Sequence, residues 1–241
     1  MSRLPAALAR GVFVTGTDTE VGKSLIAAAL IHRYNHDGQP CIGMKPVAAG
    51  ADWRQGPEGP YWHNDDVALL DQASPIRAPQ AWRCPYLFEP PIAPHVAARQ
   101  AGIRIDLDTL RSRYLQLRDI APAVVVEGAG GWLVPVDEQH TLADLAIALQ
   151  LPVVLVVGLR LGCISHALLT AQAIAASGLT LAGWVGNHID PRMLVQQENI
   201  ATLQQRLDAP CLGIVPRLEP VDLARAAEYL EWPKQPPLSP P

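Results

Sequence analysis

Short, almost uninterrupted hydrophobic runs alternate along this chain with longer segments of helical periodicity. The runs occupy residues 11–15, 41–44, 123–126, 153–157, 181–185 and 212–215. A strand that is apolar on both sides is typical of a parallel sheet covered by helices on both faces. The pattern therefore predicts an α/β fold with a mainly parallel central sheet and helices on both faces.

Between the hydrophobic runs, helices are predicted at residues 22–34, 65–71, 93–101, 106–117, 142–149, 164–176, 191–207 and 221–229. Residues 48–94 are irregular, with three tryptophans among prolines and polar side chains. Such a long excursion indicates a functional segment or a disordered insertion. We expect a short lead at residues 1–10, one α/β domain at 11–231, and a Pro-rich, disordered tail at 232–241.

Composition narrows the possible classes of function. The 241 residues carry a net charge of −4 and no long basic run, so nucleic acid is not an expected partner. Every hydrophobic stretch falls well short of the roughly 20 residues that a membrane-spanning helix needs. The cysteines at 41, 84, 163 and 211 form no Cys-x-x-Cys pair, which argues against a disulfide framework or a zinc site. A reduced, cytoplasmic location fits this pattern.

A glycine-containing turn at residues 16–24 joins the first predicted strand to the first predicted helix and ends in Gly22-Lys23-Ser24. Backbone N–H groups in such a turn bind anions, and the helix N-terminus adds its dipole. Lys23 would reach the β- and γ-phosphates, and Ser24 would ligate Mg²⁺. Five residues separate Gly16 from Gly22, one more than in the common motif, so Thr17 takes the usual glycine place. The turn and its context predict a P-loop NTPase fold.

Charged residues follow other predicted strands. Ligands of open parallel sheets bind beyond the carboxyl ends of the strands. Lys45 directly follows a predicted strand, so it would face the same crevice as Lys23. The alternative is that Lys45 is an ordinary solvated lysine. Asp66 opens a helical pattern; it is either an acidic first-turn residue or a carboxylate for Mg²⁺. Glu127 ends a buried strand and precedes three glycines, which favours a metal or nucleotide role.

Three more strand ends carry polar groups. The helix start after the strand at 153–157 could hold a substrate carboxylate, or it could be an ordinary helix start. Asn187-His188-Ile189-Asp190 is similar to the guanine-binding Asn-Lys-x-Asp loop of GTPases, with histidine in place of lysine. In either case the Asn187 amide could read a purine edge. The backbone after Pro216 could border a base.

Together these stretches resemble the dethiobiotin synthetase family, whose members close a ureido ring in biotin biosynthesis with ATP. The matching stretches are 16–24, 44–47, 64–70, 94–95, 126–132, 155–163, 181–187 and 213–216. They occur in the expected order over most of residues 11–216. The glycine-rich stretch 126–132 and the segment 161–164 weigh most, because their combination is far more specific than the phosphate-binding turn alone.

The resemblance implies a homodimeric P-loop enzyme that joins 7,8-diaminononanoate and CO₂, using ATP with Mg²⁺. It implies catalytic roles for Lys45 and Lys23, and Mg²⁺ binding by Ser24, Asp66 and Glu127. The nucleotide-binding positions that it implies are Glu20, Val21, Gly22, Lys23, Ser24, Leu25, Asp66, Glu127, Gly128, Ala129, Gly130, Asn187, His188, Pro216, Arg217 and Leu218. The implied substrate positions are Thr19, Lys45, Ala49 and, across a dimer interface, Gly162, Cys163, Ile164 and Ser165.

The chain departs from the family pattern at three positions. Ser24 replaces the usual threonine and keeps the hydroxyl, whereas Ala49 replaces a serine and Ser165 replaces an asparagine. The last two changes bear on diamine affinity rather than on the type of reaction. The nucleotide preference and the amine that is carboxylated stay open.

Two other functions are compatible with parts of the sequence. A partitioning ATPase would carry an extra lysine early in the phosphate-binding turn, and residues 17–20 contain none. A GTP-binding switch would use the loop at Asn187, although His188 in place of lysine weakens that interpretation.

Overall fold

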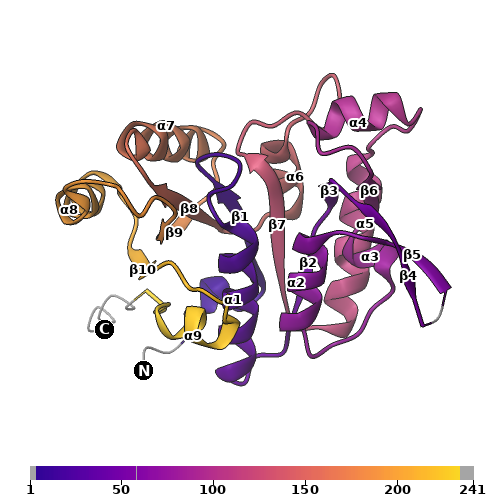
Figure 1. Cartoon of the computed structure of the whole chain (residues 1–241), viewed down its shortest axis with the longest axis horizontal. Helices are drawn as coiled ribbons and strands as arrows, with labels where there is room; N and C mark the ends of the chain where they lie inside the picture. Colours follow the sequence, from indigo (N-terminus) through magenta and orange to yellow (C-terminus); the bar gives the residue numbers. More distant parts are fainter. Residues whose placement is uncertain (1–3, 58, 234–241) are drawn as a thin grey trace, which may run out of the picture.

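A parallel six-stranded sheet forms the centre of the molecule (Figure 1), seen in a computed structural model that describes residues 4–57 and 59–233. The strand order is β10-β9-β8-β1-β7-β2, and every neighbouring pair is parallel. The strands are β1 (Gly11–Gly16), β2 (Cys41–Met44), β7 (Ala123–Gly131), β8 (Val153–Leu159), β9 (Leu181–His188) and β10 (Cys211–Val215). The predicted α/β fold with a mainly parallel sheet is confirmed.

Helices cover both faces of this sheet. Because successive side chains of a strand point to opposite faces, Val12 and Val14 of β1 pack in one hydrophobic cluster and Phe13 packs in another. The first cluster lies against α1 (Lys23–His36), α2 (Asp65–Ala73) and α9 (Leu223–Glu228). On the opposite face lie α5 (Leu107–Ile120), α6 (Leu142–Leu149), α7 (Cys163–Ala176) and α8 (Gln196–Arg206).

The predicted helices are all present; α6 has the predicted ends, and the ends of the others are shifted. The largest shift is at α8, which begins at Gln196 instead of residue 191. Asp190 accounts for it, because its side chain accepts a hydrogen bond from the N–H of Arg192 and its carbonyl accepts one from Met193. These bonds hold a turn where the sequence pattern alone continues as a helix.

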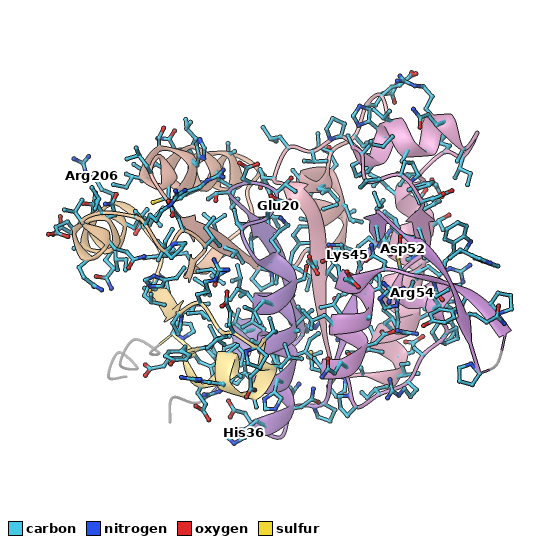
Figure 2. All side chains as sticks on the ribbon, viewed as in Figure 1. Glu20, His36, Lys45, Asp52, Arg54 and Arg206 are labelled. Carbon is cyan, nitrogen blue, oxygen red and sulfur yellow. The ribbon has the colours of Figure 1, made fainter. Side chains whose placement is uncertain are left out.

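The irregular segment at 48–94 contains short elements that the sequence pattern did not predict. β3 (Val47–Ala49) pairs in parallel with β6 (Tyr86–Phe88), and β4 (Asp52–Gly56) forms an antiparallel hairpin with β5 (Gly59–His63). The helix α3 (Gln80–Arg83) was also not predicted, whereas α4 (Pro94–Gln100) corresponds to the helix predicted at residues 93–101. The hairpin projects from the body of the molecule (Figure 1), and Figure 2 labels two of its residues, Asp52 and Arg54.

Both ends of the described chain pack against α1. The lead contains a short 3-10 helix, η1 (Ala6–Leu8), and the Leu8 carbonyl accepts a hydrogen bond from the Tyr34 hydroxyl at 2.8 Å. Trp232 was predicted to begin the disordered tail, but it is buried, and its Nε1 donates to Asp37 Oδ2 at 2.6 Å. Residues 234–241 of that tail lie outside the described residues. None of the helices in the described ranges is long and apolar enough to cross a membrane.

A buried charge cluster beside the phosphate loop

The turn between β1 and α1 lies at the carboxyl end of the central strand (Figure 1). Gly22 has a φ of +85° and precedes α1, a conformation that favours glycine. Lys23 is buried, and its Nζ donates a hydrogen bond to the Asp18 carbonyl at 2.8 Å, so the side chain folds back along the turn. Burial and, next, the nearby Lys45 lower the pKa of Lys23 to about 8. This lysine therefore loses its proton more readily than an exposed lysine does, and a bound anion would favour its charged form.

Lys45 lies between two carboxylates, those of Asp66 and Glu127. Its Nζ is 2.6 Å from Glu127 Oε1 and 2.8 Å from Asp66 Oδ2. Met44 is opposite Val126 in the register of β2 and β7, which brings Lys45 and Glu127 to adjacent places at the sheet edge. Glu127 is fully buried, Lys45 is 4% exposed, and the Asp66 side chain is 44% exposed. Two of the three charges are thus removed from water.

Ser24 connects the same two carboxylates. Its Oγ lies 2.6 Å from Asp66 Oδ1 and 2.8 Å from Glu127 Oε1, and its single proton can be donated to only one of them at a time. Asp66 reaches this position because Asn64 caps α2, accepting a hydrogen bond from the N–H of Val67. The cap therefore fixes the start of α2, so that Asp66 in its first turn lies next to Ser24 of the phosphate loop.

The pKa directions follow from burial and charge. Burial raises the pKa of Glu127, and the ammonium group of Lys45 only partly opposes this. For Asp66, burial acts in the same direction, but Lys45 and Ser24 outweigh it and the pKa is lowered. For Lys45, burial acts to lower the pKa, but the two carboxylates outweigh it and the pKa is raised. The cluster therefore retains an ammonium ion between carboxylates.

One carboxylate oxygen of this cluster is unpaired. Within residues 4–57 and 59–233, Glu127 Oε2 is buried and has no hydrogen-bond partner. Buried polar atoms normally have one, so this oxygen suits a bound cation or donor. In the same described ranges no three His, Cys, Asp or Glu residues converge on a metal position. Ser24, Asp66 and Glu127 nevertheless offer the hard oxygen ligands that Mg²⁺ takes when substrate phosphates and water supply the others.

A cavity of about 670 Å³ opens above this cluster. Many of the predicted site residues line it, namely Thr19, Glu20, Gly22, Lys23, Ser24, Lys45, Ala49, Asp66, Glu127, Ala129 and Gly130. The segment Pro91–Pro94 and Val134 also line it, and the site prediction did not include them. Of these, Pro94 alone lay in a stretch that matched the family. The others are small or apolar residues that carry no chemical signal in the sequence. The phosphate loop and the buried charge cluster therefore open into the same cavity.

A family model described as an AAA domain matches residues 10–225. The ATP-dependent dethiobiotin synthetase BioD of Aromatoleum aromaticum is 50% identical over 224 residues, which cover 93% of this chain and 98% of that protein. The protein of the same name from a Janthinobacterium species is 50% identical over 228 residues, with 92% and 97% covered. The chain belongs to the ATP-dependent dethiobiotin synthetase family.

Solved structures place this dethiobiotin synthetase family member in the P-loop NTPase fold. The MinC:MinD cell division complex of Aquifex aeolicus matches with a TM-score of 0.54 and 16% identity, covering 92% of this chain and 87% of that one. A ParA family ATPase of Chlorobium tepidum matches with a TM-score of 0.51 and 14% identity, covering 88% and 86%. Such identities show the fold alone, and the partitioning-ATPase alternative is therefore not favoured over the family with 50% identity.

Several predicted nucleotide positions of this dethiobiotin synthetase family member lie away from the large cavity. Those that do not line it are Val21, Leu25, Gly128, Asn187, His188, Pro216, Arg217 and Leu218. Asn187 is the next-to-last residue of β9 and lies opposite Val215 at the end of β10, and its buried amide donates to the Val21 carbonyl. Burial lowers the pKa of His188. The base-binding role of these strand ends stays a prediction.

The predicted substrate-carboxylate segment also lies apart from the cavity. Gly162, with a φ of +93°, precedes α7, and the Cys163 side chain is buried in the hydrophobic cluster beneath that helix. Ile164 and Ser165 continue the first turn of α7. Within one copy of the dethiobiotin synthetase family member, Gly162–Ser165 therefore does not contribute to the cavity around Lys45.

Proposed function

We propose that this chain catalyses the ATP-dependent closure of the ureido ring of 7,8-diaminononanoate with CO₂, giving dethiobiotin in biotin biosynthesis. Membership of the dethiobiotin synthetase family supports this reaction. The observation that carries it is the placement of Lys45 beside Lys23, both buried, at a cavity that the phosphate loop also lines. Two ammonium groups there suit a reaction in which every step gathers negative charge.

The proposed reaction proceeds through carbamate formation, phosphoryl transfer and ring closure. One amine of the diamine attacks CO₂, forming a C–N bond and releasing a proton to give a carbamate. A carbamate oxygen attacks the γ-phosphorus, and ADP leaves. The product of that transfer is a carbamic–phosphoric anhydride. The second amine then attacks its carbonyl carbon and loses a proton, and the C–O bond to phosphate breaks, which closes the ring and releases phosphate. Lys23 would hold the transferred phosphoryl group, and Lys45 would hold the carbamate oxygens between that group and the diamine.

Preorganised charge is the contribution of the protein to these steps. Lys45 is already fixed by two hydrogen bonds, so its ammonium group needs little reorganisation when negative charge develops nearby. Thr19 and Glu127, which line the same cavity, would complete the diamine and carbamate site. Ala49 also lines it and has no side-chain donor, so its position contributes shape rather than a hydrogen bond.

We also propose that Ser24, Asp66 and Glu127 hold Mg²⁺. The unpaired Glu127 Oε2 and the converging oxygens of the other two side chains support this assignment. When bound, Mg²⁺ would neutralise charge on the β- and γ-phosphates. The hydroxyl of Ser24 and both carboxylates are positioned by the contacts among themselves and with Lys45.

A homodimer is the assembly that we propose. The support is α7, whose fourteen residues include no Asp, Glu, Lys or Arg although about half of them are exposed. Leu161, just before α7, is 91% exposed, and Leu169 within α7 is 62% exposed. An exposed apolar patch of this kind marks an interaction site. Packing this surface on a second copy would bring the start of α7, at Gly162–Ser165, to the substrate carboxylate of the partner.

The proposed location is the cytoplasm. All four cysteines are unpaired, and three are buried, as expected for a reducing compartment. Burial raises the pKa of Cys84 to about 12, so this thiol is unreactive despite lying near Lys45. A reaction that consumes ATP is also compatible with this compartment.

Phosphate release by the purified protein with MgATP would test the function, with bicarbonate and 7,8-diaminononanoate added separately and together. We expect release only when both are present, with dethiobiotin formed in equal amount. ATP turnover that ignores the diamine would contradict the proposal and would favour a partitioning ATPase. Turnover with GTP alone would favour a GTP-binding switch. Size-exclusion chromatography with light scattering would test the dimer separately.

A further inference from the structure

Asn187 contacts the phosphate loop from the side of the sheet. Its Nδ2 donates a hydrogen bond to the Val21 carbonyl at 3.0 Å, and the residue is buried. Its backbone lies opposite Gly158 of β8 and Val215 of β10, so strands hold it on both sides. The amide therefore projects from a rigid element rather than from a flexible loop.

This contact sets the orientation of the Val21–Gly22 peptide. The peptide is trans, because the cis bond recorded in the described residues is Glu219–Pro220. In a trans peptide the carbonyl oxygen and the following N–H point in opposite directions. With the Val21 oxygen directed at Asn187, the Gly22 N–H is directed away from β9, and Gly22 lines the large cavity. Backbone N–H groups at this place in the turn are those that bind phosphate.

Packing around the same peptide holds it in one position. A Cβ at Gly22 would lie 2.1 Å from Asn187 Nδ2, so the amide occupies the space that any larger residue would need. The Val21 side chain is buried between two other glycines. A Cβ at Gly16 would lie 2.7 Å from Val21 Cγ2, and one at Gly158 would lie 2.8 Å from Val21 Cγ1. Val21 and Asn187 thus fix both the side chain and the carbonyl of this turn.

We propose that Asn187 is a positioning residue for the phosphate loop, whose amide directs the Gly22 N–H toward the nucleotide phosphates. This role is additional to the base contact that the sequence suggested, because the bond to the loop uses one amide hydrogen and leaves the second hydrogen and Oδ1 of Asn187 for other partners. It rests on the ATP site of the proposed function. It predicts that Asn187 contributes to the binding of any triphosphate, with or without a base.

The test compares ATP with inorganic tripolyphosphate. Dissociation constants for both would be measured by isothermal titration calorimetry in Mg²⁺, for the wild-type protein, Asn187→Leu and Asn187→Asp. Asn199→Leu is a matched control, because Asn199 Nδ2 makes the same kind of bond, to the Val195 carbonyl at 2.9 Å, on the surface helix α8. Melting temperatures would accompany each measurement. If Asn187→Leu does not fold, Asn187→Asp keeps the shape and places an acceptor opposite the Val21 carbonyl.

We expect both ligands to bind about tenfold more weakly to the Asn187 variants, since a buried carbonyl loses its donor. Asn199→Leu should bind both as the wild-type protein does. Weaker binding of ATP with unchanged binding of tripolyphosphate would assign Asn187 to the base and overturn the inference, as would unchanged binding of both. A lower melting temperature without weaker binding would also overturn it. If the wild-type protein binds neither ligand, the proposed function itself fails.

Discussion

Replacing Lys45 with methionine would remove the cation of the buried cluster while keeping most of the side-chain volume. Lys45 is 4% exposed, and its Nζ lies 2.6 Å from an oxygen of the fully buried Glu127. In Lys45→Met, the Glu127 carboxylate would keep only the hydrogen bond from Ser24. An ionised carboxylate without a counter-ion is costly in an apolar environment, so the folded state should lose stability.

The magnitude follows from the burial of each partner. Removing one member of a buried ion pair costs about 3–5 kcal/mol, because the other charge is left uncompensated. Water can replace Lys45 at Asp66, whose side chain is 44% exposed, but not at Glu127. We therefore expect the free energy of unfolding to fall by about 3 kcal/mol at pH 8, which is the lower end of that range.

The pH dependence has a definite sign. Burial raises the pKa of Glu127 above its unfolded value of 4.5, and loss of Lys45 would raise it further. A raised carboxyl pKa means that the folded state binds more protons than the unfolded state, so stability falls as pH rises from about 4.5 through the folded pKa. The deficit of Lys45→Met should therefore shrink as pH falls toward 4.5, where Glu127 becomes protonated.

Urea unfolding followed by circular dichroism, without nucleotide or Mg²⁺, would measure this deficit at pH 8 and pH 5. Lys45→Met/Glu127→Gln should recover most of the loss, because it removes the uncompensated charge. Arg54→Met is the matched control. Arg54 also lies near two carboxylates, those of Asp52 and Asp65, but on the surface, so its loss should cost less than about 1 kcal/mol. A deficit below 1 kcal/mol for Lys45→Met, or one that is equal at both pH values, would refute this reasoning.

Three further predictions concern the proposed reaction, the assembly and the C-terminal contact. Lys45→Gln should lower diamine-dependent phosphate release by about 10²–10³-fold, and an unchanged rate would remove Lys45 from the mechanism. Leu169→Glu should shift the protein toward monomer in light scattering, since it places a charge on the uncharged helix α7; a stable dimer would contradict the proposed interface. Burial acts to raise the pKa of Asp37, but its hydrogen bonds, the first from Trp232, outweigh burial and lower it. The Asp37 carboxylate should therefore stabilise the folded state above pH 3.8, and this contribution should be lost as pH falls through its lowered pKa. In urea unfolding, the free energy of unfolding of Asp37→Asn should fall less in acid than that of the wild-type protein.

The strands and helices of the sheet were predictable because their signals are local. A strand buried on both faces is apolar along most of its length, and each of the six strands contains such an apolar run, with polar residues confined to the carboxyl-end half of β7 and of β9 and to Thr15 of β1. β7 nevertheless continues to Gly131, beyond the predicted end at Val126, because its last residues still pair with β1. Hydrophobic periodicity marks burial, whereas pairing depends on a neighbouring strand.

The segment between β2 and α4 was not predictable in the same way. β3 and β6 are three residues each, and each becomes a strand only by pairing with the other across a long stretch of sequence. β4 and β5 are largely exposed, with Trp53 and Trp62 rings 5.0 Å apart, so they show no buried run. Their order comes from cross-strand contacts, which a local pattern does not contain.

The sequence by itself determined which chemistry is available: a phosphate-binding turn, a lysine after one strand, a carboxylate at the end of another strand and a carboxylate at the start of a helix. It also determined that these groups would meet at one edge, because parallel strands place their carboxyl ends together. Only the tertiary structure decided how they are paired, with Lys45 between Asp66 and the buried Glu127 and with the Asn187 amide on the phosphate loop. Those pairings depend on strand register and on the depth of burial, and both arise from contacts between residues far apart in the chain.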